Sequence, residues 1–314
     1  MKTVDYDQAD PLGVLHLNLV SLGYSLTPER VALIRQLDVR PFPFFAIYAI
    51  EDDIVAGQVG VYRLQVVTTH GLEAVGGACA VCTHPAFSGR GIATRLMEEA
   101  HERMRAAGLR FSTLGTARHR AAYALYRRLG YEDVYTVRTT MARRVGVRSD
   151  TRLRAERLGA DQLDLTDDVF KRAAAGRLGF AWRHTGFIPM MASTGDIDAE
   201  AVWLLWDGDA PVGYAIAQPS EQVLMVSNLL LVEGADAAEA IAAMAQALAV
   251  AYMSVRIDHE SVATSLRQAG YPPAQPEWGV FMMKPLTPEV TVEEARSLLA
   301  IGTERFLISD IDVT

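Results

Sequence analysis

The stretch Gly76–Tyr131 contains the residues whose types and spacing could do chemistry. An apolar segment ending at Thr83 is followed by His84 and then by Ser88-Gly-Arg-Gly-Ile-Ala-Thr94, which opens an amphipathic segment. Small residues at a helix start directly after a strand suit a phosphate, because backbone N–H groups point outward and the helix dipole favours negative charge. Tyr126, on a later helical segment, can serve as a proton donor.

Hydrophobic periodicity predicts the elements that must position these residues. Helices are expected over Pro11–Leu22, Pro28–Leu37, Gly91–Ala107 and Arg120–Leu129, the last two ending at glycines. Strands are expected over Phe42–Ile50, Ile54–Gln65, Gly76–Thr83, Phe111–Gly115 and Val134–Ala142. The glycines inside Ile54–Gln65 indicate a bulge or a close backbone approach.

The second half repeats this order of elements. Strands are expected over Ala201–Trp206, Ala210–Gln218, Val223–Val232, Ser254–Ile257 and Gly279–Met283, and helices over Ala237–Tyr252 and Glu260–Ala269. His119 precedes Tyr131 by twelve positions, and His259 precedes Tyr271 by twelve, so the two helix ends lie in register. A tail follows, with a helix expected over Thr291–Leu299 and a strand over Arg305–Ile311.

Composition points to a soluble globular chain long enough for two domains. It has 314 residues, of which 50% are hydrophobic and 22% charged. No apolar run reaches the roughly 18–20 residues of a membrane span, and no apolar signal core follows Met1. Two cysteines provide no disulfide framework, so we expect a cytoplasmic protein.

The net charge of −8 is unevenly divided between the two halves. Residues 1–150 carry 18 basic and 15 acidic side chains (+3), whereas residues 151–314 carry 12 and 23 (−11). Many of the first half's basic residues lie between Arg90 and Arg128, where they would favour a ligand with several phosphates. An ordinary solvated helix face is the alternative. The acidic total argues against nucleic-acid binding.

The spacing in Gly76–Tyr131 resembles motifs A and B of the GNAT superfamily, the acyl-CoA-dependent N-acyltransferases. Gly91 and Ala93 match the family's Arg/Gln-x-x-Gly-x-Gly/Ala loop, with Ser88 in place of Arg or Gln. His119, Ala122 and Tyr126 follow its Asn-x-x-Ala-x-x-x-Tyr pattern, with His in place of Asn, and Leu129-Gly130-Tyr131 closes the motif.

The resemblance implies an α/β fold of two GNAT-like domains, each with a central mixed β-sheet flanked by helices. Residues 1–144 would form the catalytic domain that binds acetyl-CoA, 151–286 a degenerate second domain, and 287–314 a C-terminal tail. The reaction would move an acetyl group from acetyl-CoA, without a metal, to a primary amine of a small molecule or peptide. Neither nucleic acid nor membrane is expected as a partner, and a homo-oligomer is compatible with the sequence.

Site residues are carried over from the family one by one. Tyr126 would be the catalytic acid that gives its proton to the departing thiolate. The backbone of Val81, Cys82 and Thr83 would meet the thioester and the pantetheine amides, where a bulge splays this strand from its neighbour. The remaining cofactor contacts would be Ser88, Gly89, Arg90, Gly91, Ile92, Ala93, Thr94, His119 and Ala122. A plain buried strand and a core tyrosine remain the alternatives.

The general base is not identified by the sequence. Glu73, His70 and His84 are candidates near the central strands, and Asp310, Asp312 or Thr314 of the tail could supply a carboxylate, as in the enhanced-intracellular-survival acyltransferases. Cys79 and Cys82 have C-x-x-C spacing, but residues three apart on a strand face opposite sides, so we interpret them as buried apolar residues.

The second half departs from the motif where it matters. Glu233 and Asp236 stand where phosphates would lie, and Leu266 stands at the position equivalent to Tyr126. Like charge repels a polyanion and leucine has no proton to give, so this half is expected to be silent and to wall the acceptor site. Two other functions stay open: a non-catalytic acyl-CoA sensor or scaffold, and an acidic second half that binds a basic protein or polyamine.

Overall fold

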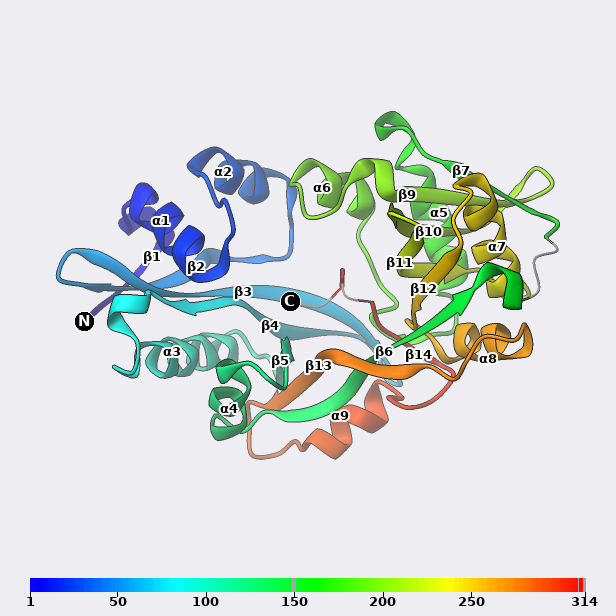
Figure 1. The fold of residues 1–314 in the computed structure, drawn as a ribbon. Coiled ribbons are helices and arrows are strands. Elements are labelled where there is room, and N and C mark those ends of the chain that lie inside the picture. Colours follow the sequence, from blue (N-terminus) through cyan, green and yellow to red (C-terminus); the bar gives the residue numbers. More distant parts are fainter. Residues whose placement is uncertain (148–150, 310, 313–314) are drawn as a thin grey trace.

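The computed structural model describes residues 1–147, 151–309 and 311–312, and its core is a mixed sheet of 14 strands. Helices cover both faces of this sheet (Figure 1), which confirms the predicted α/β class. The strands are β1 Lys2–Asp5, β2 Pro41–Glu51, β3 Ile54–Thr68, β4 Gly71–Thr83, β5 Phe111–Ala117, β6 Glu132–Arg143, β7 Leu153–Arg157, β8 Leu178–Gly179, β9 Val202–Asp207, β10 Ala210–Ser220, β11 Val223–Leu231, β12 Tyr252–Arg256, β13 Gln275–Pro285 and β14 Phe306–Leu307. The α-helices are α1 Pro11–Leu22, α2 Pro28–Leu37, α3 Ile92–Ala106, α4 Ala121–Arg128, α5 Leu165–Ala173, α6 Phe187–Ser193, α7 Ala237–Ala247, α8 Glu260–Gln268 and α9 Val292–Leu298.

The two halves of the sheet share one topology. In the first half the order is β1-β2-β3-β4-β5, and every neighbouring pair is antiparallel except β4 and β5. In the second half the order is β7-β9-β10-β11-β12, and only β11 and β12 are parallel. The internal repeat that the sequence indicated is therefore present in the strand order.

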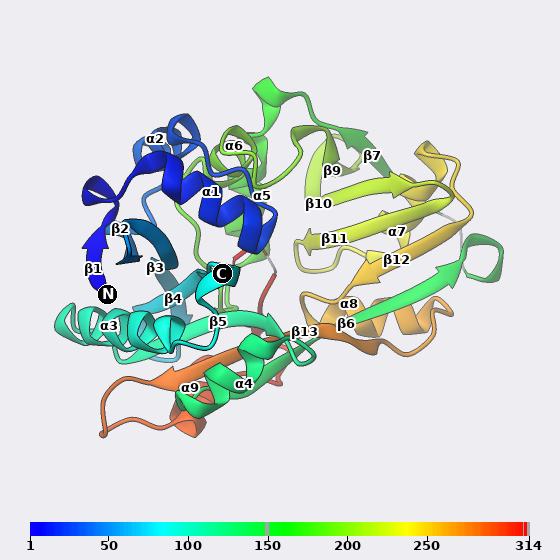
Figure 2. The same ribbon diagram turned by 60° about the vertical axis from the view of Figure 1, so that its left-hand side comes forward.

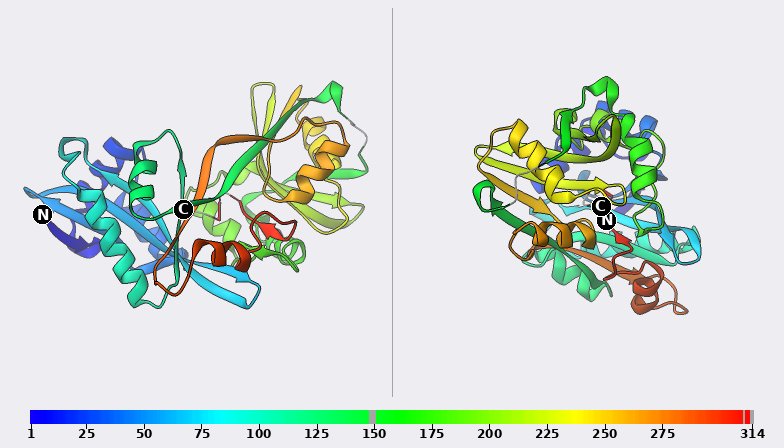
Figure 3. Two further views of the ribbon diagram at one scale, coloured as in Figure 1. Left: turned by 90° about the horizontal axis from the view of Figure 1, so that it is seen from below. Right: turned by 90° about the vertical axis from the view of Figure 1, so that its right-hand side faces the viewer.

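The halves exchange a strand. β13, from the end of the second half, lies between β5 and β6, while β6, from the end of the first half, lies between β13 and β12. Figure 3 shows the orange β13 and the green β6 running together from one lobe to the other. Neither half completes its sheet with its own chain, which the sequence did not predict.

Helix α3 fixes the place of the loop that precedes it. Its buried residues Ile92, Leu96, Met97, Ala100 and Met104 recur at helical spacing and face the sheet. The helix lies unusually close to β3, because a Cβ on Gly57 would stand 2.6 Å from the Cγ2 atom of Ile92. The close approach predicted from the glycines of this strand is thus confirmed.

Most elements match the sequence expectations within a few residues, and most of the exceptions lie in the second half. Strands β1, β7 and β8 were not predicted. Helix α7 ends at Ala247 rather than Tyr252, and the tail strand spans only Phe306–Leu307. Helices α5 and α6 were not predicted. α6 lies beside α2 of the first half (Figure 1 and Figure 2), and its Met191 contacts Arg40, so it contributes to the contact between the halves.

The exchanged strand predicts that the halves unfold together. Met282 of β13 is fully buried in the first half's core, so Met282→Ala should destabilise the protein by about 2–5 kcal/mol. Three of the four tryptophans, at 182, 203 and 206, lie in the second half outside the exchanged strand, and the fourth, at 278, is on β13 itself. In urea titrations, tryptophan fluorescence and far-UV circular dichroism should shift to lower denaturant together.

The matched control is Met141→Ala, because Met141 of β6 is 55% exposed and should leave both curves in place. An unshifted fluorescence curve beside a shifted dichroism curve in Met282→Ala would mean that the halves are independent.

Candidate active site

Strands β4 and β5 open into a wedge at their carboxyl ends. Their parallel ladder consists of Gly76–Ser112 and Gly77–Thr113 and stops there, although both strands continue. Beyond this point β4 carries a bulge: Cys79 pairs with Gly60 and Cys82 with Gln58, so two residues of β4 oppose one of β3. Ala80 in the bulge has φ 47°, a left-handed conformation that is costly for alanine.

The loop after β4 offers backbone amides to solvent. Gly91 caps α3 with φ 76°, and no side chain accepts a hydrogen bond from the first turn. The first intrahelical bond at this end runs from the Arg95 N–H to the Gly91 carbonyl, which leaves the earlier N–H groups of the turn without a helical acceptor. Residues 88–91 are exposed, so an anion can reach these amides.

Tyr126 of α4 faces the same region. It is 5% exposed and lies in one apolar cluster with Ile92, against which Val81 and Ala122 pack. Burial raises the pKa of its phenol to about 12, and its hydroxyl forms no hydrogen bond within the described part of the chain. A phenol with so high a pKa is protonated at neutral pH, so Tyr126 carries a proton that it could donate.

Tyr131 holds the ring of Tyr126 in place. The two rings meet edge to face with centroids 5.9 Å apart. The hydroxyl of Tyr131 is fixed by Ser112 Oγ at 2.6 Å and His101 Nε2 at 2.9 Å. Burial lowers the pKa of His101 to about 3, so this buried network stays uncharged at neutral pH.

A match to a known protein family identifies the domain that has this geometry. Residues 22–134, which include the wedge, the loop and Tyr126, match the acetyltransferase (GNAT) domain. The chain carries a GNAT acetyltransferase domain. The enzyme class that the sequence predicted, a GNAT-type N-acyltransferase, is thereby confirmed. No curated protein matches the chain in sequence.

Solved structures share the fold over nearly the whole chain. A GCN5-related N-acetyltransferase from Kribbella flavida is 20% identical, with a TM-score of 0.64 over 91% of this chain and 72% of the other. One from Anabaena variabilis ATCC 29413 is 15% identical, with a TM-score of 0.65 over 91% and 73%. Eis1 from Mycobacterium abscessus is 14% identical, with a TM-score of 0.60 over 91% and 74%. The likeness extends beyond the matched domain, so the second half belongs to the shared fold.

Other predicted site residues lie around the GNAT wedge in different surroundings. Cys82 is buried on the opposite face, in the cluster under α1, and Thr83 accepts a hydrogen bond from Ser21 Oγ at 3.2 Å on its carbonyl. Arg90 is tied to Glu51 by an ion pair of 2.9 Å. Ala93 and Thr94 are half-buried in the first turn of α3. His119 is exposed in the turn before α4, and no described contact links it to the loop.

The cysteines behave as small apolar residues. Both are free thiols, and burial raises the pKa of each to about 12, so neither is a thiolate at neutral pH. No group of three or more metal-ligating side chains occurs in the described ranges. None of the described helices is long and apolar enough to cross a bilayer.

The candidates for a base are separated from the wedge or already engaged. Glu73 starts β4, far from its carboxyl end, and accepts two hydrogen bonds from Arg110 at 2.8 and 2.9 Å; His70 lies in the preceding turn. His84 accepts the Ala86 N–H on Nδ1 at 3.2 Å, so its neutral ring carries the proton on Nε2. Asp312 is held by Arg183. Asp310 and Thr314 lie outside the described residues.

The second half contains the same wedge and turn, but its own side chains occupy them. The β11–β12 ladder ends at Val226–Val255, and Asp258 then accepts hydrogen bonds from the Leu229 N–H at 3.1 Å and Asn228 Nδ2 at 2.6 Å. At the turn, Asp236 caps α7 by accepting the Ala238 N–H at 2.7 Å. Ser265 Oγ accepts the Ala237 N–H at 3.1 Å. The groups that stand open in the first half are satisfied here.

A cavity of about 240 Å³ lies between the halves, beside the open end of β5. The first half lines it with residues of β5 and β6, and the second half with the exchanged strand β13, the segment Arg256–Asp258 and the tail residues Ile308 and Ser309. Its walls therefore come from both repeats and from the tail. A second substrate entering here would meet the wedge from the side of the second half.

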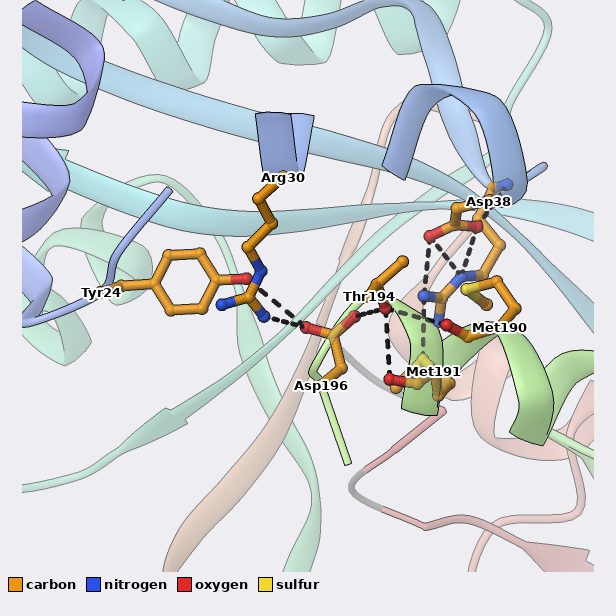
Figure 4. A network of polar contacts seen from close by, with 8 residues as sticks. Tyr24, Arg30, Asp38, Met190, Met191, Thr194 and Asp196 are labelled. Atoms are coloured by element: carbon orange, nitrogen blue, oxygen red, sulfur yellow. Dashed lines mark hydrogen bonds and ion pairs between the residues drawn. The ribbon is translucent and has the colours of Figure 1, made fainter. Parts of the chain in front are cut away.

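A polar network holds the first half's helices against α6 (Figure 4). Asp196 accepts from Arg30 at 3.2 Å, from Thr194 Oγ1 at 2.7 Å and from Tyr24 Oη at 3.5 Å. Farther along, Arg40 pairs with Asp38 at 2.8 Å and contacts Met191 Sδ at 3.3 Å. The network links α2 to the second half above the wedge.

The open turn predicts a selective loss of coenzyme A binding in Gly91→Ala. An alanine at φ 76° strains the turn and misdirects its amides at a cost of about 1–2 kcal/mol, so we expect about fivefold to thirtyfold weaker binding by calorimetry.

The matched control is Gly108→Ala, at φ 78° beyond the other end of α3. This variant carries the same backbone strain away from the turn, so it should lower the melting temperature but keep the affinity. Equal loss of affinity in both variants would mean that strain, not the amides, is responsible.

Proposed function

We propose that this chain transfers an acetyl group from acetyl-CoA to a primary amine of a small molecule or peptide. One observation carries the proposal: exposed amides at the start of α3, an unpaired wedge and the buried phenol of Tyr126 are adjacent in the first half. The amides would bind the pyrophosphate, the wedge would stabilise the developing oxyanion, and the phenol would protonate the departing thiolate.

The loop at residues 88–94 would hold the pyrophosphate. Its amides and the dipole of α3 attract negative charge, and the helix is 15 residues long. Arg90 is paired with Glu51, so the backbone rather than this side chain supplies most of the attraction. Ser88, which replaces the family's usual Arg or Gln, therefore weakens binding only modestly.

The bulged end of β4 would hold the thioester. The pantetheine chain lies between β4 and β5 and pairs with backbone groups of Val81, Cys82 and Thr83. A backbone N–H at the bulge then donates to the carbonyl oxygen and stabilises the oxyanion as the amine attacks. Such a donor is fixed by the sheet, so no reorganisation accompanies the reaction.

Tyr126 would protonate the departing thiolate of coenzyme A. The amine nitrogen forms a bond to the carbonyl carbon, the carbon–sulfur bond breaks, and the thiolate takes the proton of the Tyr126 hydroxyl. The proton released by the amine returns to the phenolate through solvent, so the products are an amide and coenzyme A. The apolar cluster around Tyr126 excludes water and keeps its pKa high.

The halves would divide the work unequally. Residues 1–144 bind acetyl-CoA and perform the chemistry, with β13 completing their sheet. Residues 151–286 are silent because Asp236, Ser265 and Asp258 occupy their turn and wedge. Together with the tail at 287–314, they wall the acceptor cavity.

The acid role predicts the effect of Tyr126→Phe. Removing one hydroxyl should lower kcat by about 100-fold or more while the dissociation constant of coenzyme A stays unchanged. A raised pKa of about 12 means that the phenol is fully protonated at neutral pH and loses its proton only as pH approaches that value. Wild-type turnover should therefore not decline between pH 8 and pH 10 through this group.

Stopped assays with an amine panel would measure both effects. Tyr123→Phe is the matched control, because Tyr123 lies on the same helix and its hydroxyl contacts Asp133 at 3.3 Å. Equal kcat in wild type and Tyr126→Phe would remove Tyr126 from the mechanism. Tight acyl-CoA binding with no turnover of any amine would favour the sensor.

The filled second wedge predicts the stoichiometry. Calorimetric titration should give one coenzyme A per chain, because side-chain oxygens already accept from the amides of α7. Asp236→Ala should still bind one coenzyme A per chain in the calorimetric titration, since Ser265 still covers the turn. Two sites per wild-type chain would contradict the assignment of the second half.

A further inference from the structure

The second half has a cavity that the acyl-transfer proposal does not use. It measures about 330 Å³, at the lower end of the range for small-molecule sites, and lies between the end of α5, the β11–α7 turn and the start of α8. By the repeat, this is the counterpart of the first half's cofactor site. Two of its polar side chains, Arg177 and His259, have unmet bonding capacity.

Arg177 lines this cavity with a guanidinium that is partly shielded from water. Its side chain is half-buried, and no salt bridge to it occurs among the described residues. Its one hydrogen bond runs to the Leu231 carbonyl at 3.4 Å, and its pKa is lowered by burial. Glu233 attracts it only partly, from an exposed position on the rim. A partly buried cation of this kind is stabilised by an anion beside it.

His259 presents a second donor to the same cavity. It is 6% exposed and caps α8, accepting the Ser261 N–H on Nδ1 at 3.2 Å. Since Nδ1 accepts, the neutral ring carries its proton on Nε2. Among the described residues that buried Nε2 makes no hydrogen bond of good geometry, because the Glu304 carbonyl interacts with the ring only at the margin of hydrogen-bonding geometry. An unsatisfied buried N–H requires an acceptor.

The remaining charges set the kind of anion that fits. Arg172 is engaged by Asp168 at 2.9 Å, and the exposed side chains of Arg305, Glu233 and Glu304 stand on the rim. The amides of α7, which would grip a pyrophosphate, are capped. The inner wall thus offers one cation and one neutral donor, enough for a single oxyanion group and too little for coenzyme A.

We propose that this cavity binds a small metabolite through one carboxylate or phosphate group, held by the Arg177 guanidinium and the Nε2–H of His259. The site is separate from the wedge of the first half and does not depend on the acyltransferase proposal. A charge-assisted pair of this geometry accounts for both unmet groups with one ligand.

Calorimetric titration of the full chain with inorganic phosphate and, separately, acetate tests the site. The wild type should bind at least one of the two, and the stronger ligand identifies phosphate or carboxylate as the recognised group. Arg177→Met keeps the apolar stem and should weaken binding by about tenfold or more. His259→Asn retains an N-cap oxygen but lacks the distal N–H and should also weaken it.

The matched control is Arg267→Ala, which removes an exposed arginine of α8 outside the cavity and should leave the affinity unchanged. Melting curves check that each variant folds. If Arg177→Met does not fold, Arg177→Gln takes its place. The proposal would be overturned if the wild type bound neither phosphate nor acetate at 20 mM. So would an affinity that survives both Arg177 and His259 substitutions, because the anion would then lie elsewhere.

Discussion

The pairing of β13 with β5 is the interaction on which the geometry of the proposed active site depends. A strand that leaves its neighbour must satisfy its backbone elsewhere, or buried N–H and carbonyl groups remain unpaired. β5 leaves β4 after Thr113, but its other edge stays bonded to β13 from Phe111 to Ala117. The second half thus holds β5 in place while the wedge stays open. β6 does the same for β12, so one exchange of strands supports both wedges.

The two wedges show two ways of satisfying the same backbone groups. Amides at a helix start need an acceptor, which is either a ligand or a side chain. In the second half Asp236 and Ser265 supply that acceptor permanently, each for a net gain of about 0.5–2 kcal/mol. In the first half Gly91 has no side chain to offer, so the turn gives up this stability and keeps its capacity for an anion. At this position a turn capped by side chains is more stable but has no free amides for an anion, whereas an uncapped turn can bind an anion but is less stable.

Local signals in the sequence predicted the parts of the fold that local chemistry controls. The bounds of α1 and α2 follow from Asp10 and Thr27, which cap helices that begin with proline. The turn at Gly91 and the helix with Tyr126 were likewise readable. The bulge in β4 was expected only from the family resemblance. Its left-handed residue is Ala80, with φ 47°, and alanine is not a residue type that indicates such a backbone conformation.

Long-range partners were not readable. The strand Gly279–Met283 was expected, but nothing in its residues tells which strands it joins, since β-pairing is decided by the whole sheet. Asp236 was interpreted through its charge, whereas its main effect is to accept the Ala238 N–H. The cavity with Arg177 and His259 could not be inferred either, because it depends on which nitrogen of a buried ring meets Ser261.

The ion pair that joins the two halves and the ion pair that joins the second half to the tail differ greatly in what they can determine. Arg30 and Asp196 are about a quarter exposed, so their pair contributes roughly 0–1 kcal/mol and guides rather than fixes the position of α2. Arg183 and Asp312 are each 5% exposed, and the carboxylate accepts two hydrogen bonds at 2.7 and 2.8 Å. Removing one partner of such a pair leaves a buried charge at a cost of about 3–5 kcal/mol. The course of the tail, and with it the cavity wall at Ile308 and Ser309, is therefore determined by Arg183.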